Sequence, residues 1–132
     1  MLGRTPFELV ATITLAINYA AAYVVTFVWD VPTPSLELAL HIGIVLVASL
    51  LFGTLIADIK KTIVYTVVSV IMGIAIAMIA IIMPALILAE GPGIIDLYLS
   101  VGLSELSRLF IIGISFVVLG TLVGAFLAEA MK

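Results

Sequence analysis

Four long stretches of the chain contain no Asp, Glu, Lys, Arg or His, and this feature restricts the available folds more than any other. They cover residues 9–29, 42–57, 62–89 and 109–128 of a chain of 132 residues. A helix of about 20 apolar residues is roughly 30 Å long, which matches the hydrocarbon core of a bilayer. The sequence therefore predicts an all-α fold with four long hydrophobic helices.

The apolar sides of these helices need a cover other than water. The chain is 65% hydrophobic and 10% charged, whereas soluble domains are about half apolar. Five basic and eight acidic side chains supply too little polar surface for a soluble domain of this size. We therefore expect lipid or identical neighbours to cover the helices. Because the chain has no Cys, disulfides, thiolate metal sites and Cys nucleophiles are excluded.

The predicted helix boundaries come from proline and capping residues. In TPFE, residues 5–8, Pro6 suits a first helical turn and Glu8 occupies the carboxylate position of a capping box. The prolines of VPTPS, residues 31–35, separate the first helix from the second. A very short polar turn at residues 58–61 separates the second helix from the third.

The stretch after EGPG is the exception to the pattern of long apolar helices. Residues 94–107 are too apolar for a loose loop, yet Gly102 and several polar residues interrupt them. The pattern predicts a short additional helix that lies along an interface or packs on a neighbour.

One helix ending occurs twice, as LFGTLIADIKK at residues 51–61 and as LVGAFLAEAMK at residues 122–132. The offset of 71 residues between them also aligns small residues of the second and fourth helices, such as Gly53 with Gly124. An offset of 57 residues aligns small residues of the first and third helices, such as Ala16 with Gly73. We infer a tandem duplication of a helical hairpin, with repeat 1 at about 5–59 and repeat 2 at about 62–132. The predicted architecture is one domain, residues 1–132, folded as an up-down four-helix bundle.

Small residues recur four positions apart in each helix, which places them on one face and lets two backbones approach closely. The predicted helix-packing residues are Ala16, Ala20, Ser49, Gly53, Ala57, Gly73, Ala77, Gly120, Gly124 and Ala128.

The two ends of the predicted bundle differ in charge. Counting Lys, Arg, Asp and Glu, one end has four basic and three acidic side chains, and the other has one basic and five acidic ones. In a bilayer this asymmetry would place both chain termini in the cytoplasm. In a coat it would turn the basic end toward nucleic acid phosphates. The candidate basic residues, facing DNA or the cytoplasm, are Arg4, Lys60, Lys61 and Lys132.

Catalysis is not expected, because no ionisable residue lies in the middle of a predicted helix. Asn18 is interpreted as an interhelical hydrogen-bond donor, with a polar pore lining as the alternative. His41 has no further metal ligands at suitable spacing, and Glu105 and Arg108 form a plausible surface ion pair. The sequence predicts no catalytic residue, cofactor, metal site or small-molecule substrate.

The pattern resembles the major coat proteins of spindle-shaped archaeal viruses. These are short, extremely hydrophobic chains of helical hairpins with a polar turn, and the hairpin is doubled in the larger viruses. The repeated LFGTLIADIKK and LVGAFLAEAMK, with Lys60 and Lys61 in the turn, carry the likeness, which covers the whole chain. The resemblance implies a non-enzymatic capsid protein of the virion, assembled in many copies around double-stranded DNA. The four basic residues named above would then face the DNA.

The alternative is a four-span integral membrane protein of a cell. It would be an accessory subunit of a membrane complex, or a small channel or transporter, with lipid as its surroundings and both termini cytoplasmic. The absence of charged residues within the predicted spans argues against active transport but not against an accessory subunit.

Overall fold

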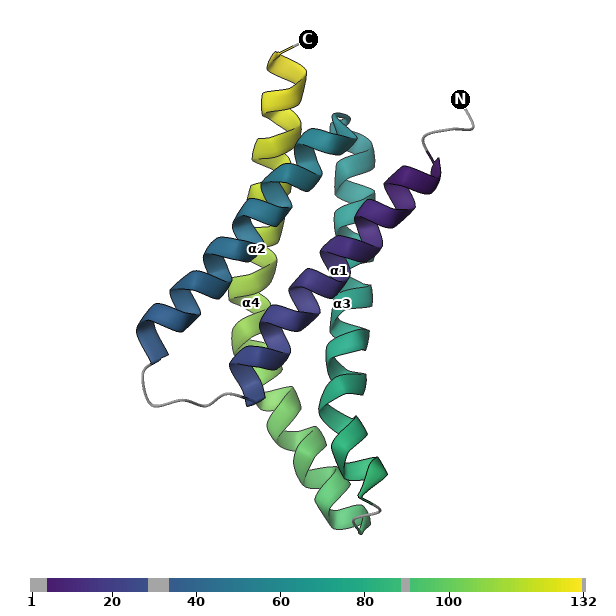
Figure 1. Cartoon of the computed structure of the whole chain (residues 1–132), viewed down its shortest axis with the longest axis vertical. Helices are drawn as coiled ribbons and strands as arrows, with labels where there is room; N and C mark the ends of the chain where they lie inside the picture. The colour runs from purple at the N-terminus through teal and green to yellow at the C-terminus, as the bar shows by residue number, and fades with distance from the viewer. Residues whose placement is uncertain (1–4, 29–33, 89–90, 132) are drawn as a thin grey trace.

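All the secondary structure in the described residues is α-helical (Figure 1). The computed structural model describes the backbone of residues 5–28, 34–88 and 91–131, and the side chains of these residues except 5, 23, 25–28, 34–38, 105–106, 108–109 and 112–113. The helices are α1 (Thr5–Val28), α2 (Pro34–Ile56), α3 (Ile59–Ile87) and α4 (Pro92–Ala130). The predicted all-α class is confirmed.

Local chemistry accounts for where these helices begin. α2 starts at Pro34 and α4 at Pro92, because the first turn of a helix does not need the N–H that proline lacks. Asp58 caps α3 by accepting a hydrogen bond from the Lys61 backbone N–H at 3.1 Å. Between α2 and α3, Ala57 has a φ of 51°, a left-handed conformation that ends α2 abruptly. α3 therefore begins three residues before the predicted start at residue 62.

The prediction of a separate short helix at residues 94–107 is wrong. These residues form the first part of α4, which continues for 39 residues. The hydroxyls of Ser100 and Ser107 donate to carbonyls one turn back in α4, at 2.9 and 2.8 Å, so they need no break in the helix. Gly102 is buried where α4 meets α3, and a Cβ built on it would lie 3.5 Å from Ile81 Cγ2. A small residue there permits close approach and does not mark a helix end.

The prediction of four long hydrophobic helices is also wrong in number. Within the described residues, two segments are long and apolar enough to cross a membrane, Ala39–Ile56 and Ile59–Ile87. Three further apolar segments, Pro6–Ala22, Pro92–Ser104 and Ile114–Ala130, are shorter than 18 residues. The apolar segments of α4 are short because the charged residues Glu105 and Arg108 divide its sequence into two parts.

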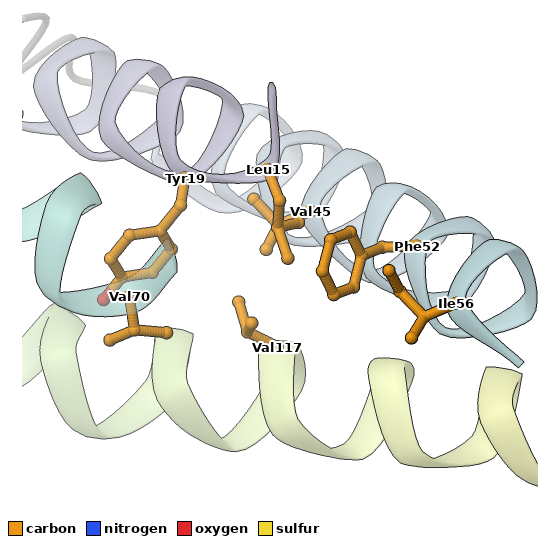
Figure 2. Packing of buried hydrophobic residues seen from close by; sticks show 7 residues of the cluster. All are labelled: Leu15, Tyr19, Val45, Phe52, Ile56, Val70 and Val117. Carbon is orange, nitrogen blue, oxygen red and sulfur yellow. The ribbon is translucent and has the colours of Figure 1, made fainter. Parts of the chain in front are cut away.

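The helices pack mainly across the two halves of the chain. α2 and α4 form the most extensive helix contact, followed by α1 with α3 and then α3 with α4. Figure 1 shows that α2 and α4 run in the same direction, as do α1 and α3. All four helices contribute to the central hydrophobic cluster, whose side chains converge between them (Figure 2): Leu15, Tyr19, Val45, Phe52, Ile56, Val70 and Val117.

Small and hydroxylated residues occupy the interior, while many large aliphatic residues face outward. Ser49, Thr62, Ser69 and Thr121 are at most 1% exposed and are among the largest fully buried side chains. By contrast, exposed fractions of roughly half or more are found for large apolar residues on every helix, among them Leu9, Val47, Val64, Ile71, Ile79, Leu119 and Phe126. A water-soluble domain also buries large apolar residues, but it does not leave this many of them exposed on every helix.

Candidate functional site

The α2–α4 crossing brings two helix backbones into direct contact at glycines. A Cβ built on Gly53 would overlap the Thr121 carbonyl oxygen and lie 2.9 Å from the Ala125 nitrogen. A Cβ on Gly124 would overlap the Leu50 carbonyl oxygen and lie 3.0 Å from the Thr54 nitrogen. Any side chain at either glycine would therefore force the helices apart.

These contacts are reciprocal between α2 and α4. Gly53 meets residues 121 and 125 of α4, and Gly124, which is 71 positions later, meets residues 50 and 54 of α2. Adding the same offset to residues 50 and 54 gives 121 and 125. The contact is therefore isologous, with equivalent faces of equivalent helices meeting across an approximate two-fold axis.

The α1–α3 crossing has a single glycine at its centre. A Cβ on Gly73 would lie 2.7 Å from Tyr19 Cδ1 and 3.0 Å from the Ala16 carbonyl oxygen. One turn further along, Ala20 and Ala77 are each 2% exposed and belong to one buried cluster. The small residues of this crossing thus meet at the offset of 57 positions that aligns them in the sequence.

A polar cluster lies beside this crossing, at the first turns of α1 and α3. Glu8 is 6% exposed, although it is a carboxylate. Its Oε1 accepts a hydrogen bond from Lys61 Nζ at 3.0 Å, and its Oε2 accepts one from the Tyr65 hydroxyl at 3.0 Å. The cation and the hydroxyl compensate for removing this charge from water. Local sequence patterns do not predict this contact, although the offset of 57 residues that aligns Ala16 with Gly73 also aligns Glu8 with Tyr65.

The buried hydroxyls of the two crossings differ in how they are satisfied. In the α2–α4 crossing, Ser49 donates to the Val45 carbonyl at 2.6 Å and Thr121 to the Val118 carbonyl at 3.1 Å. In α3, the buried Thr62 and Thr66 hydroxyls have no hydrogen-bond partner among the described residues. Thr12 in α1 and Ser69 in α3 are also buried, but their hydroxyls donate to the Glu8 and Thr66 carbonyls at 2.7 and 3.0 Å. The unsatisfied hydroxyls of α3 are therefore those of Thr62 and Thr66 among the described residues.

A shallow apolar groove of about 340 Å³ separates α1 from α2 on the outside of the molecule. Asn18 lies on its wall, and the Asn18 Oδ1 atom is buried with no hydrogen-bond partner among the described residues. The predicted role of Asn18 as an interhelical donor belongs to its amide NH₂ group, so this acceptor oxygen does not test that prediction. The groove is lined by Phe7, Val10, Ala11, Thr14, Leu15, Asn18, Ala48, Leu51, Phe52 and Leu55.

Most of the predicted packing residues lie at the two crossings. Ser49, Gly53, Gly120 and Gly124 meet where α2 crosses α4, and Ala16, Ala20, Gly73 and Ala77 meet where α1 crosses α3. Ala57 lies in the turn after α2, and Ala128 is half-buried in the last turns of α4.

The structure brings together the described parts of the predicted basic end. Figure 1 shows the start of α1, the α2–α3 turn and the end of α4 at the same end of the molecule. Lys60 and Lys61 therefore lie at this end, together with Glu8, Asp58 and the exposed Glu129. Arg4 and Lys132 lie outside the described residues.

The remaining residues singled out in the sequence are His41, Glu105 and Arg108. His41 is half-buried in α2, and the side chains of Glu105 and Arg108 lie outside those that the structure describes. Across the described parts of the chain, no group of three or more His, Asp or Glu residues is placed to hold a metal ion.

Comparisons with protein-family models, with curated protein sequences and with solved structures find no match for this chain. Its function is therefore argued from its own residues.

Proposed function

We propose that the chain is a non-enzymatic integral membrane protein, built from two tandem hairpins in an up-down arrangement, that serves as a helical subunit of a larger assembly. The observation that carries this proposal is the number of large aliphatic side chains that are exposed on all four helices. Serine, threonine, glycine and alanine fill the crossings, while large aliphatic residues cover the outside of all four helices. Small and hydroxylated residues are typical of helix contacts within lipid, where burial of apolar surface does not drive association.

Two further features support a location in the bilayer. Ala39–Ile56 and Ile59–Ile87 are adjacent segments of membrane-spanning length, joined by a two-residue connection. Lys60 and Lys61 follow this connection, where the positive-inside rule places basic residues on the cytoplasmic side. On this proposal the ion pair between buried Glu8 and exposed Lys61 lies near the cytoplasmic surface, and both chain termini are cytoplasmic.

Expression in a bacterial host followed by fractionation tests the proposal. We expect the protein in the membrane fraction, resistant to alkaline carbonate and released by detergent as a small defined oligomer. Cysteines introduced at Lys60 and at Asp96, in a chain with no native Cys, should be labelled by an impermeant maleimide from opposite sides of the membrane. Release without detergent, or labelling of both cysteines from one side, would contradict it.

A self-assembling coat protein that encloses double-stranded DNA is the second candidate. The length of α4 favours it, because 39 residues form a helix of about 58 Å, well beyond the roughly 30 Å of a bilayer core. In such a coat, neighbouring copies would cover the exposed aliphatic residues. Particles that contain this chain as the dominant protein together with nuclease-protected DNA would select this candidate over the membrane subunit.

A further inference from the structure

The α2–α4 crossing has the reciprocity expected of an interface between two copies of one hairpin. Gly53 contacts the backbone at residues 121 and 125, and Gly124 contacts the backbone at the equivalent residues 50 and 54. An isologous contact of this kind arises when one surface pairs with itself around a two-fold axis. Here both copies belong to one chain, and they are joined through Ala57 and Asp58 alone.

The contacts between the hairpins are more extensive than those within the first hairpin. α2 packs chiefly on α4 and α1 packs chiefly on α3, whereas α1 and α2 are partly separated by the apolar groove. The central cluster in Figure 2 likewise draws its side chains from both hairpins. We therefore expect contacts between helix faces to hold the two hairpins together. The connecting turn contributes mainly by keeping the hairpins close to each other, which raises their effective concentration.

We propose that the protein is a fused dimer of hairpins, and that the α2 face with Ser49 and Gly53 is an interface that binds an α3–α4 hairpin even when it is supplied in trans by a second copy of this chain. The inference rests on the proposed membrane location, because hairpins inserted separately in a bilayer can associate afterwards through their helix faces.

The test uses the full chain with a protease site inserted between Ala57 and Asp58 and an affinity tag at the N-terminus. The uncut protein is first purified from membranes in detergent and is then cleaved. We expect the untagged half, residues 58–132, to remain with the tagged half through affinity and size-exclusion steps. Mixing with a cleaved, fluorescently labelled second sample should then produce exchanged pairs.

Matched glycine variants show whether contacts between α2 and α4 retain the untagged half after cleavage. Gly53→Leu would force α2 from the Thr121 backbone, so we expect roughly tenfold or greater loss of the retained half. Gly43→Leu is the control in the same helix, because a Cβ on Gly43 has no neighbour within 4 Å. Gly53→Ala provides a milder change if the leucine variant does not accumulate in membranes.

The outcomes separate this inference from the proposed function. Halves that dissociate on cleavage, while the uncut chain remains a membrane protein, would overturn the fused-dimer inference and leave the membrane proposal standing. Equal retention in the Gly53 and Gly43 variants would overturn the assignment of the α2 face. An uncut chain that never enters the membrane would instead overturn the proposed function.

Discussion

The α2–α4 crossing joins helices through their backbones, whereas the α1–α3 crossing places polar side chains beside a single glycine. At the first, Gly53 and Gly124 lie against carbonyl oxygens, and the buried hydroxyls are satisfied within their own helices. At the second, a buried carboxylate needs Lys61 and Tyr65, and two threonine hydroxyls have no partner among the described residues. The difference teaches that two helix pairs of one chain can be held together by close backbone fit in one pair and by electrostatics in the other.

Adding one methyl group at the α2–α4 crossing should produce the largest effect. We expect Gly53→Ala to lower the free energy of unfolding by about 1–3 kcal/mol, because the new Cβ overlaps the Thr121 carbonyl. Gly43→Ala, in open space on the same helix, should instead raise it by up to about 1 kcal/mol through helix propensity. Thermal unfolding in detergent, followed by circular dichroism, measures both. Equal responses would mean that the crossing is not held by close backbone contact.

Removing the cation at the α1–α3 crossing should produce an intermediate effect. Lys61→Met deprives the buried Glu8 carboxylate of its cationic partner, so we expect a clear fall in melting temperature. Lys60→Met, one residue earlier and exposed, should leave the melting temperature unchanged.

A double variant tests whether charge is the cause of that fall. Glu8→Gln combined with Lys61→Met removes the carboxylate charge and keeps an oxygen for the Tyr65 hydroxyl, so it should recover part of the lost stability. If the double variant is no more stable than Lys61→Met, the ion pair does not hold α1 on α3.

Replacing a buried threonine by valine, which changes a hydroxyl to a methyl group, should produce the smallest effect. The change in the free energy of unfolding should differ in sign between Thr121 in α4 and Thr66 in α3. Thr121→Val loses a hydrogen bond to the Val118 carbonyl and should cost about 0.5–1.5 kcal/mol. Thr66→Val removes a buried hydroxyl with no partner among the described residues, so stability should stay level or rise. Both substitutions keep the side-chain shape, and the same unfolding assay compares them. A loss at Thr66 equal to that at Thr121 would show that the Thr66 hydroxyl is satisfied in solution.

Helix positions and small-residue spacing could be predicted from the sequence because each depends on local chemistry. Uncharged stretches indicated the helices, the prolines of residues 31–35 indicated the boundary between α1 and α2, and the two offsets aligned small residues that lie at the two crossings. An offset shows only that two positions are equivalent, however, and not that they touch. Contact between equivalent faces required the structure, which places α2 beside α4 and α1 beside α3.

The errors have specific physical causes. Gly102 and the serines of residues 94–107 indicated a break, but Gly102 packs against Ile81 and serine hydroxyls bond within α4, so the helix continues. Glu8 was assigned to helix capping because its neighbours in sequence suited that role. Its bonds to Lys61 and Tyr65 depend on a tertiary contact that a local pattern does not reveal.

The unequal helix lengths have a consequence for any lipid around the protein. α1 has 24 residues and α4 has 39, so the two differ in length by about 22 Å along their axes. The apolar sequence of α4 is divided into Pro92–Ser104 and Ile114–Ala130, so the hydrocarbon core of a bilayer cannot surround the whole helix. On the membrane proposal, the Pro92–Ser104 part of α4 would therefore extend beyond the hydrocarbon core, on the side of the bilayer opposite Lys60 and Lys61 (Figure 1).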